Sequence, residues 1–543
     1  MRRGRLRWGV FLVALASTGA WAAPGLRVTS AALLPDRLFP HLIRYCVEGS
    51  ELREEAGLPN EFADPERRGA VLHLFVRNQG REPVEVKQVL LDGLDLSKHL
   101  LPLYREHEGL RAASFLLNDP RTTPPTVRDQ LEALGAPQWY QVRPNPVPAG
   151  GIAQVTVRLR RLPRGKTLSL AAGASGAPAV GTRLRADRPA QLSLASVGFP
   201  EGGDRLFLYL RHAEGKEFLL RSVRLDGTET AVAPDQPRRN FAGFLPVVVT
   251  LPAAWEVGSF HHLQATTNEG EVAAAVVRAQ EPFFALGMWG YRNYGETLPQ
   301  RARDTCSAFR AHLFNTHMGM AGEQTGYLES AAGLQLLQEM GLRLLARAPD
   351  ALTCGYPRLY ARFLLDEPDV QDYFVNNLPD DRRLGCYGQA LADRQRQWVA
   401  ADPRTPTLLN VDLTYKPENW LVYGQLPDIL AIDPYYQELL RGAYWKHPGR
   451  FGPLSHPYFV FACSEIARWA GEPRPLHVIL NAISYRDPRD PAQTFRYGTP
   501  EEKRVECYYA LAAGVRGISY WWFTPYGEYR GCGADDPGAR AMM

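Results

Sequence analysis

The pattern of apolar and polar positions changes character near residue 280. Before that point, short segments such as Val71–Gly80 and Ile152–Arg160 alternate apolar and polar residues with a period of two. Gly, Asn, Asp and Pro separate these segments, which is typical of antiparallel β-sandwiches. Beyond it, short apolar runs alternate with segments of helical periodicity, and this order indicates a parallel sheet.

The first part of the chain therefore predicts two tandem sandwiches, over residues 24–181 and 182–280, the second of them Ig-like. An insert over 101–139 interrupts the first, and Val127–Leu134 in it has the pattern of a short helix. The small residues of Ala171–Gly181 are typical of a linker or loop. Neither module contains a catalytic constellation, so a rigid spacer and a sugar-positioning module both remain open.

Residues 281–543 predict a (β/α)8 barrel of the TIM type. The expected strands are Phe283–Gly287, His312–Asn315, Leu342–Ala346, Arg362–Leu365, Thr407–Val411, Ile429–Ile432, His477–Leu480 and Gly517–Trp522. The expected helices are Leu328–Met340, Leu391–Ala400, Phe459–Ala470 and Glu501–Ala513. Few residues follow the eighth strand, and Asp535–Arg540 lacks a helical pattern. We therefore expect the closing helix to be missing or replaced.

The strongest chemical signal lies at the end of the fourth expected strand. The apolar run Phe363–Leu365 leads directly into Asp366 and Glu367, and Pro368 ends it. In barrels of this type the catalytic groups follow the carboxyl ends of the strands. A purely structural alternative is a strand end followed by an acidic cap for the next helix. Two adjacent carboxylates at this position favour catalysis, with Asp366 and Glu367 as the catalytic residues.

Polar and aromatic residues follow the other expected strands, and together they suit a carbohydrate. Aromatic rings stack on the apolar face of a pyranose, while carboxylates and amides bind its hydroxyl groups. The strand-end residues are Trp289, Tyr291, Asn315, His317, Arg347, Asn410, Asp412, Asp433, Tyr435, Tyr436, Asn481, Tyr485, Trp521, Trp522 and Tyr526. The substrate-binding candidates among them are Trp289, Tyr291, His317, Arg347, Asp412, Asp433, Tyr435, Asn481, Trp521 and Trp522.

Glycoside hydrolysis needs a protonated carboxyl group and a second group that stabilises the oxocarbenium-like centre. In substrate-assisted enzymes the 2-acetamido oxygen of the sugar attacks, and an adjacent Asp–Glu pair such as Asp366 and Glu367 can support it. A pair from strands four and seven is disfavoured, because strand seven ends in Asn481. Glu367 with Asp433 from strand six is an open alternative, and the distance between the carboxyl groups decides its stereochemistry.

The segment from Leu364 to Asp369 resembles the Asp–Glu motif of glycoside hydrolase family 123, and Tyr508–Trp522 resembles the region before and through its eighth strand. The resemblance covers mainly 283–523. It implies a retaining β-N-acetylhexosaminidase with Asp366 as acetamido stabiliser and Glu367 as general acid/base. It also implies that Tyr435 binds the acetamido oxygen and that Trp521 forms the floor under the sugar. The alternative is a degenerate barrel that binds carbohydrate, or serves a structural role at the cell surface, without cleaving it.

Charge and cysteine spacing argue against several other kinds of binding site. The net charge is only +4 and no dense basic block occurs, which argues against nucleic acid as a partner. Seven cysteines are scattered without Cys-x-x-Cys spacing, so no zinc or iron–sulfur site is expected. His317, Asp412 and Asp433 could in principle converge on a metal, but no metal-binding spacing supports this. We expect no cofactor, and Cys354 with Cys386 is the first disulfide to test.

The N-terminus has the pattern of a signal peptide over residues 1–23. Four arginines precede the apolar stretch Trp8–Ala16, and Ala20–Ala22 offers a small-x-small cleavage site. This predicts a secreted, periplasmic or cell-surface protein with no membrane span after cleavage. An uncleaved anchor is the alternative.

Overall fold

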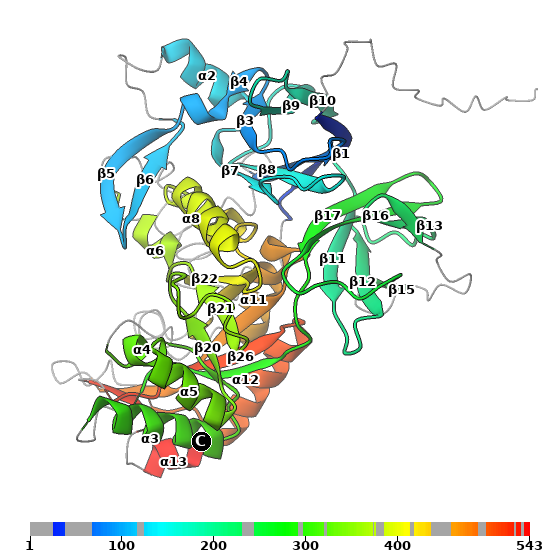
Figure 1. The fold of residues 1–543 in the computed structure, drawn as a ribbon. Coiled ribbons are helices and arrows are strands. Elements are labelled where there is room, and N and C mark those ends of the chain that lie inside the picture. The colour runs from blue at the N-terminus through cyan, green and yellow to red at the C-terminus, as the bar shows by residue number, and fades with distance from the viewer. Residues whose placement is uncertain are drawn as a thin grey trace, which may run out of the picture.

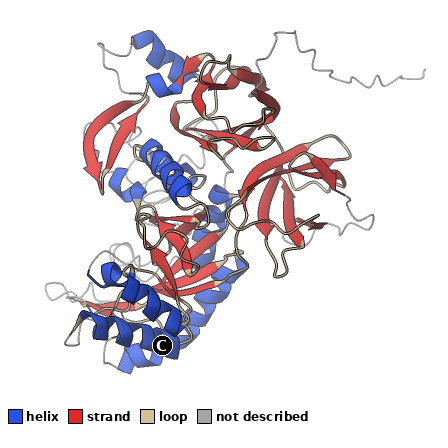
Figure 2. Ribbon diagram, viewed as in Figure 1, coloured by secondary structure: helices blue, strands red, loops and turns tan. Residues whose placement is uncertain are grey.

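We describe a computed structural model of the chain. The structure describes residues 25–37, 68–116, 124–230, 244–291, 297–319, 323–372, 374–375, 385–412, 417–435, 458–486, 496–525, 528–533 and 537–542. The expected signal peptide, Tyr436 and Tyr526 lie outside these residues. The described part comprises two β-sandwiches and a barrel (Figures 1 and 2), as the sequence pattern predicted.

The first sandwich packs two antiparallel four-stranded sheets around an aliphatic core. One sheet has the order β1 (Leu26–Pro35), β2 (Ala70–Asn78), β8 (Ile152–Leu159) and β7 (Pro137–Arg143). The other has the order β10 (Val180–Arg185), β9 (Thr167–Ala174), β3 (Val86–Leu91) and β4 (Leu94–Asp95). The predicted linker or loop Ala171–Gly181 comprises the end of β9, a turn over residues 175–179 and the start of β10, so it joins two paired strands rather than two modules.

The insert of the first sandwich carries the expected helix, α2 (Pro125–Ala133), and a hairpin of β5 (Leu101–His107) and β6 (Leu110–Ser114). The hairpin packs against the barrel, because Leu103, Leu110 and Ala112 belong to the barrel's hydrophobic core. Ala113 also donates a backbone hydrogen bond of 2.8 Å to the carbonyl of Cys386. The first sandwich therefore reaches over to the barrel.

The second sandwich pairs a three-stranded with a four-stranded antiparallel sheet. The first comprises β11 (Leu192–Gly198), β12 (Arg205–His212) and β15 (Leu245–Thr250). The second has the order β14 (Thr228–Thr230), β13 (Leu220–Leu225), β16 (Phe260–Thr267) and β17 (Val272–Arg278). Side chains alternate along β15, so Leu245, Val247 and Val249 lie in the core, whereas Val248 and Thr250 are exposed.

The barrel is closed by eight parallel strands. They are β18 (Ala285–Met288), β19 (Thr316–His317), β20 (Arg343–Ala346), β21 (Leu359–Phe363), β22 (Thr407–Asp412), β23 (Ile429–Asp433), β24 (Leu476–Asn481) and β26 (Gly517–Trp521). The barrel closes where β26 pairs with both β18 and β24. One expected strand was misplaced: residues 312–315 form the turn after a helix, and the strand follows them.

Helices surround the barrel strands and also form caps at their ends (Figure 1). They are α3 (Leu298–Ala311), α4 (Glu323–Leu328), α5 (Ala331–Met340), α6 (Pro368–Asp372), α8 (Gly388–Ala401), α9 (Pro417–Tyr423), α11 (Tyr458–Gly471) and α12 (Pro500–Ala512). Local sequence explains where α12 begins. Thr499 and Glu502 form a reciprocal capping box, and Pro500 occupies the first helical position, where its missing N–H is harmless.

Two details differ from the sequence expectations. Residues Pro537–Met542 form a short helix, α13, where we expected no helix, and Met542 packs beside the buried cluster around Phe314 and Phe523. Cys354 and Cys386 are both free thiols, so the expected disulfide is wrong.

A buried carboxylate joins all three modules. Asp428, just before β23, forms ion pairs with Arg143 from the first sandwich and Arg278 from the second, the latter at 2.7 Å. Its Oδ2 also accepts a hydrogen bond of 2.9 Å from the backbone N–H of Thr407. Although burial opposes ionisation, the two arginines hold the pKa of Asp428 below its usual range. The modules are therefore linked by charges as well as by apolar contacts.

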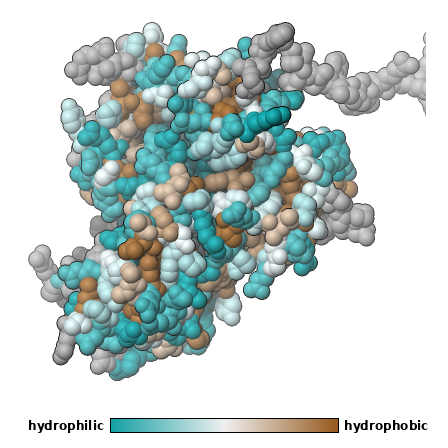
Figure 3. Space-filling model, in the orientation of Figure 1, coloured by the Kyte–Doolittle hydropathy of each residue, from teal (hydrophilic) through white to brown (hydrophobic). Residues whose placement is uncertain are grey.

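The face of the molecule shown in Figure 3 is mainly hydrophilic, with apolar side chains scattered between polar ones. Among the described residues, no helix combines the length and apolar character needed to cross a bilayer.

Candidate functional site

The end of β21 turns Glu367 into the mouth of the barrel. Glu367 has a left-handed backbone with φ of 45°, which is unusual for a residue other than glycine. Its N–H donates to the carbonyl of Asn410 at 3.0 Å, and its own carbonyl accepts from Val370 at the start of α6. These bonds hold the chain between strand and helix in one conformation. Strained backbone of this kind clusters at functional sites in proteins generally.

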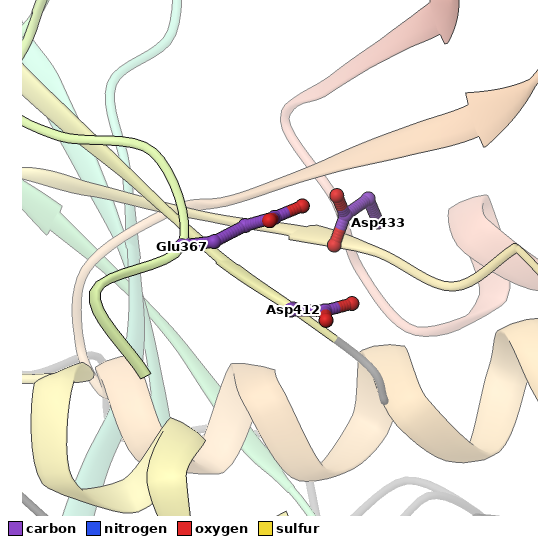
Figure 4. A group of neighbouring side chains, drawn as sticks. All are labelled: Glu367, Asp412 and Asp433. Atoms are coloured by element: carbon purple, nitrogen blue, oxygen red, sulfur yellow. The ribbon is translucent and has the colours of Figure 1, made fainter. Parts of the chain in front are cut away.

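Three carboxylates from neighbouring strands meet at this point. Asp412 and Asp433 are register partners in the parallel pair β22–β23, so their side chains lie side by side. Oxygens of Glu367, Asp412 and Asp433 all lie within 4.8 Å of one another. Figure 4 shows the oxygens of Glu367 directed at Asp433, with Asp412 beneath both. Glu367 is half-buried, whereas Asp433 is only 2% exposed.

An asparagine connects this carboxylate triad to Asp366. The side-chain amide of Asn410 donates 3.0 Å hydrogen bonds to Oδ1 of Asp366 and to Oδ2 of Asp433. Asn410 and Asp412 are two residues apart on β22 and therefore point to the same face of the strand. Below them, the carboxylate of Asp369 accepts from the backbone N–H of Asp412 at 3.1 and 3.2 Å. The site is thus a continuous network of acidic and amide groups.

Crowding and burial shift the titration of these acids. Burial, followed by the charges of Glu367 and Asp412, raises the pKa of Asp433 well above its usual range. A hydrogen bond between Asp433 and Glu367 acts in the same direction, which requires one of them to be protonated. Enclosure by the walls of the mouth, and then the charge of Glu367, raises the pKa of Asp366 to about 7, although its side chain is still solvent-exposed.

Aromatic side chains form a wall beside the acids. Tyr435 and Trp521 stack with ring centroids 5.6 Å apart and an interplanar angle of 23°. Trp522 stacks on Trp521 at 5.7 Å, and Tyr529 meets Trp521 edge to face at 5.9 Å. Tyr529 belongs to β27 (Tyr529–Gly531), which pairs with β25 (Ile483–Tyr485). Trp521 and Trp522 keep part of their surface accessible, whereas Tyr435 is 8% exposed.

Two predicted site residues lie in packed surroundings instead. Trp289 is 5% exposed, donates its indole N–H to Ser519 at 2.9 Å and meets Phe363 edge to face. His317 is 1% exposed, and its ring centroid lies 5.1 Å from that of Phe309 in α3. Neither side chain offers surface to a ligand in this structure. Trp289 follows β18 and His317 is the last residue of β19, but both side chains face the packed interior.

The remaining predicted residues have mainly structural contacts. Arg347 forms an ion pair with Glu329, with hydrogen bonds of 2.6 and 2.8 Å. Asn481 is 2% exposed and accepts from the backbone N–H of Ile483 at 2.8 Å. Tyr291 is half-buried, and its backbone exchanges hydrogen bonds with the Thr524 hydroxyl. No contact of these three with the carboxylate triad is present among the described residues.

Sequence reasoning missed the contribution of the first sandwich. The charges of His107 and Glu108, at the tip of the β5–β6 hairpin, both act on Asp366. Arg394 of α8 ties this tip to the barrel, since it donates to the carbonyls of Glu108 and Leu364 at 2.5 and 2.8 Å. The only signal was that the insert over 101–139 is long for a sandwich loop.

No protein-family model matches the chain, and a search of curated proteins gave no match. Solved structures with some similarity include a GH2 β-galacturonidase from Eisenbergiella tayi, with 13% identity, 84% of this chain and 82% of that chain covered, and a TM-score of 0.28. A β-galactosidase from Marinomonas ef1 has 10% identity, 47% and 57% coverage and a TM-score of 0.35. An FMN-binding β-glucuronidase from Facaelibacterium prausnitzii has 10% identity, 96% and 82% coverage and a TM-score of 0.29.

Proposed function

We propose that the protein is a glycoside hydrolase in which Glu367 is the general acid/base. The observation that carries this proposal is the position of Glu367, half-buried at a barrel strand end with its carboxylate directed at Asp433. A second carboxylate this close favours keeping a proton on the pair near neutral pH, because two adjacent negative charges repel. A general acid needs that proton for the leaving oxygen.

The proposed mechanism is substrate-assisted and retaining, on a 2-acetamido sugar. Glu367 donates its proton to the glycosidic oxygen while the acetamido oxygen attacks C1, which breaks the glycosidic bond and forms a cyclic intermediate. Asp366 accepts a hydrogen bond from the acetamido N–H and stabilises the positive charge that develops there. Glu367 then takes a proton from water, which attacks C1 and reopens the ring. The hydroxyl group of Tyr435 binds the acetamido oxygen, and the ring of Trp521 forms the floor under the sugar.

A second candidate uses Glu367 with Asp433 as two carboxylates on either side of the bond. Their oxygens lie within 4.8 Å and the two side chains are hydrogen-bonded. Retaining enzymes of this kind place the carboxyl groups about 5–5.5 Å apart, and inverting enzymes about 6.5–9.5 Å apart. The observed spacing therefore favours a retaining pair over an inverting one. In this candidate Asp433 is the nucleophile, and the substrate needs no acetamido group.

Turnover of aryl N-acetylhexosaminides and of the matching aryl hexosides separates the candidates. We expect Glu367→Gln to lose about 10²–10⁴-fold in kcat, with partial recovery on a dinitrophenyl leaving group that needs no acid. Asp366→Asn then impairs only the acetamido substrates if the first mechanism operates, whereas Asp433→Asn abolishes both substrate series in the second. Asp372→Asn is the control for a nearby buried carboxyl group.

Equal turnover by wild type and Glu367→Gln would rule out the catalytic assignment of Glu367. Glycan-array binding without turnover of any glycoside would instead indicate a carbohydrate-binding protein on a degenerate barrel.

We also propose that the chain is exported after cleavage near Ala23, supported by the basic and then apolar start of the sequence. N-terminal sequencing of the protein from an exporting host tests this. An intact Met1 in the exported fraction would contradict cleavage.

A further inference from the structure

We propose that Glu367, Asp412 and Asp433 bind a hard divalent cation of the calcium class at the barrel mouth. One oxygen of each lies within 4.8 Å of the other two. Calcium binds oxygens at about 2.3–2.6 Å, so oxygens on opposite sides of the ion are at most about 5 Å apart. The three carboxylates therefore fit around one ion without moving apart. This inference goes beyond the proposed hydrolysis and does not depend on it.

Unsatisfied oxygens at the same place provide the second observation. Asp433 is 2% exposed, and no N–H group among the described residues donates to its Oδ1, so this oxygen is left to a proton shared with Glu367 or to a ligand. Figure 4 shows the oxygens of Asp433 on the side that faces Glu367 and Asp412. Asn410, also 2% exposed, donates its amide N–H to Asp433, and its buried carbonyl Oδ1 has no partner in the described part of the chain. Buried polar atoms normally have partners, so these oxygens point to a ligand.

The charges around the triad favour a cation as that ligand. The ionised groups that act on Asp433 are Glu367, Asp412 and Asp366, and all three are acidic. Every donor atom is a carboxylate or amide oxygen, which suits calcium, magnesium or manganese rather than zinc or copper. The left-handed turn at Glu367 fixes the one ligand that comes from outside β22 and β23.

A bound cation would compete with acid catalysis. A carboxylate of Glu367 that holds the ion cannot carry the proton needed by a leaving group. We therefore expect calcium to inhibit hydrolysis, with chelator restoring it. Binding itself is measurable without substrate, so failure of the hydrolase proposal leaves this one testable.

Isothermal titration calorimetry of the EDTA-treated full chain with calcium, magnesium and manganese chloride tests the site. We expect one saturable site for at least one of these ions, and a Tm increase of about 2 °C or more at saturating ion, because the ion binds only the folded protein. Asp412→Asn should weaken binding at least ten-fold. Asp372→Asn, which changes a buried carboxyl group outside the triad, should bind the ion as the wild type does.

Terbium luminescence on the wild type keeps the test independent of variant folding. Terbium should bind with the same stoichiometry, and calcium should displace it. If neither heat nor luminescence reveals saturable binding up to millimolar ion, or if Asp412→Asn and Asp372→Asn bind equally well, the triad is held together by shared protons and the cation site is wrong.

Discussion

Glu367 combines two features that the sequence reveals to different degrees. Its carboxylate at a strand end was visible in the sequence, because an apolar run leads straight into it. Its left-handed backbone and its contact with Asp433 were not, because they depend on the register of β22 and β23 and on the start of α6. Local pattern therefore identifies the acid, while three-dimensional pairing decides which groups surround it.

The backbone of Glu367 gives a stability prediction. Glycine adopts positive φ without steric cost, so Glu367→Gly should raise the free energy of unfolding by about 1 kcal/mol relative to Glu367→Gln. Both variants remove the negative charge, and only the first relieves the backbone. Urea unfolding monitored by tryptophan fluorescence measures the difference. A glycine variant that is less stable than the glutamine variant would show that the turn is not strained.

Asp372 gives a pH prediction. Burial raises the pKa of Asp372 to about 8, despite hydrogen bonds from Gly385, Cys386 and Tyr423. The native state then binds a proton that the unfolded chain has lost above about pH 4, so this contribution to stability is present at low pH and is lost as pH rises through 8. The stability of wild type relative to Asp372→Asn should fall by at least about 1 kcal/mol from pH 5 to pH 9. A pH-independent difference would contradict the raised pKa.

At the scale of elements, the alternation of apolar runs and helical patterns was sufficient to place most barrel strands. The second strand was misplaced because only two residues, Thr316 and His317, pair in it. The apolar residues before it belong to a turn, where Leu313 has φ of 64° and is 79% exposed. The position of the β5–β6 hairpin beside Asp366 could not be predicted, because contacts between distant segments leave no periodic pattern.

The packing of α8 on β7 gives a prediction at this scale. A Cβ added to Gly388, the first residue of α8, would lie 2.9 Å from Cγ of Trp139. Trp139 is fully buried and its indole N–H bonds the carbonyl of Val422 at 2.9 Å, so it cannot move aside. Gly388→Ala should lower the free energy of unfolding by about 1–3 kcal/mol. In the control, Gly341→Ala, the added Cβ meets no atom within 4 Å, although its φ of 67° is itself strained.

If Gly388→Ala is as stable as the wild type, the added methyl group does not clash with Trp139. A second variant, Gly388→Ala with Trp139→Phe, should recover part of the loss, because the smaller ring leaves room for the new methyl group.

At the scale of the whole molecule, the two sandwiches are integral to the barrel. The first supplies the hairpin beside Asp366, and both supply an arginine to Asp428. The order of modules was predictable from the change in periodicity. Their mutual orientation was not, because ion pairs between Arg143, Arg278 and Asp428 join residues more than a hundred positions apart.

Asp428→Asn tests this junction. It leaves two buried arginines without their counter-charge, and breaking a buried ion pair from one side costs about 3–5 kcal/mol. We expect the calorimetric transition to move to lower temperature and to separate into more than one step as the modules lose their coupling. The exposed ion pair of Asp187 with Arg185 serves as control, and Asp187→Asn should change the Tm little. An unaltered single transition in Asp428→Asn would contradict the role of the junction.

The spacing of the acids at the mouth makes the stereochemistry of the proposed hydrolysis its most direct test. Proton NMR of a freshly started reaction identifies the anomer of the sugar that is released first. Glu367 and Asp433 bring two oxygens within 4.8 Å of each other, whereas inverting enzymes hold their carboxyl groups about 6.5–9.5 Å apart to admit the attacking water. We expect the first product to keep the anomeric configuration of the substrate; release of the opposite anomer would contradict both proposed mechanisms.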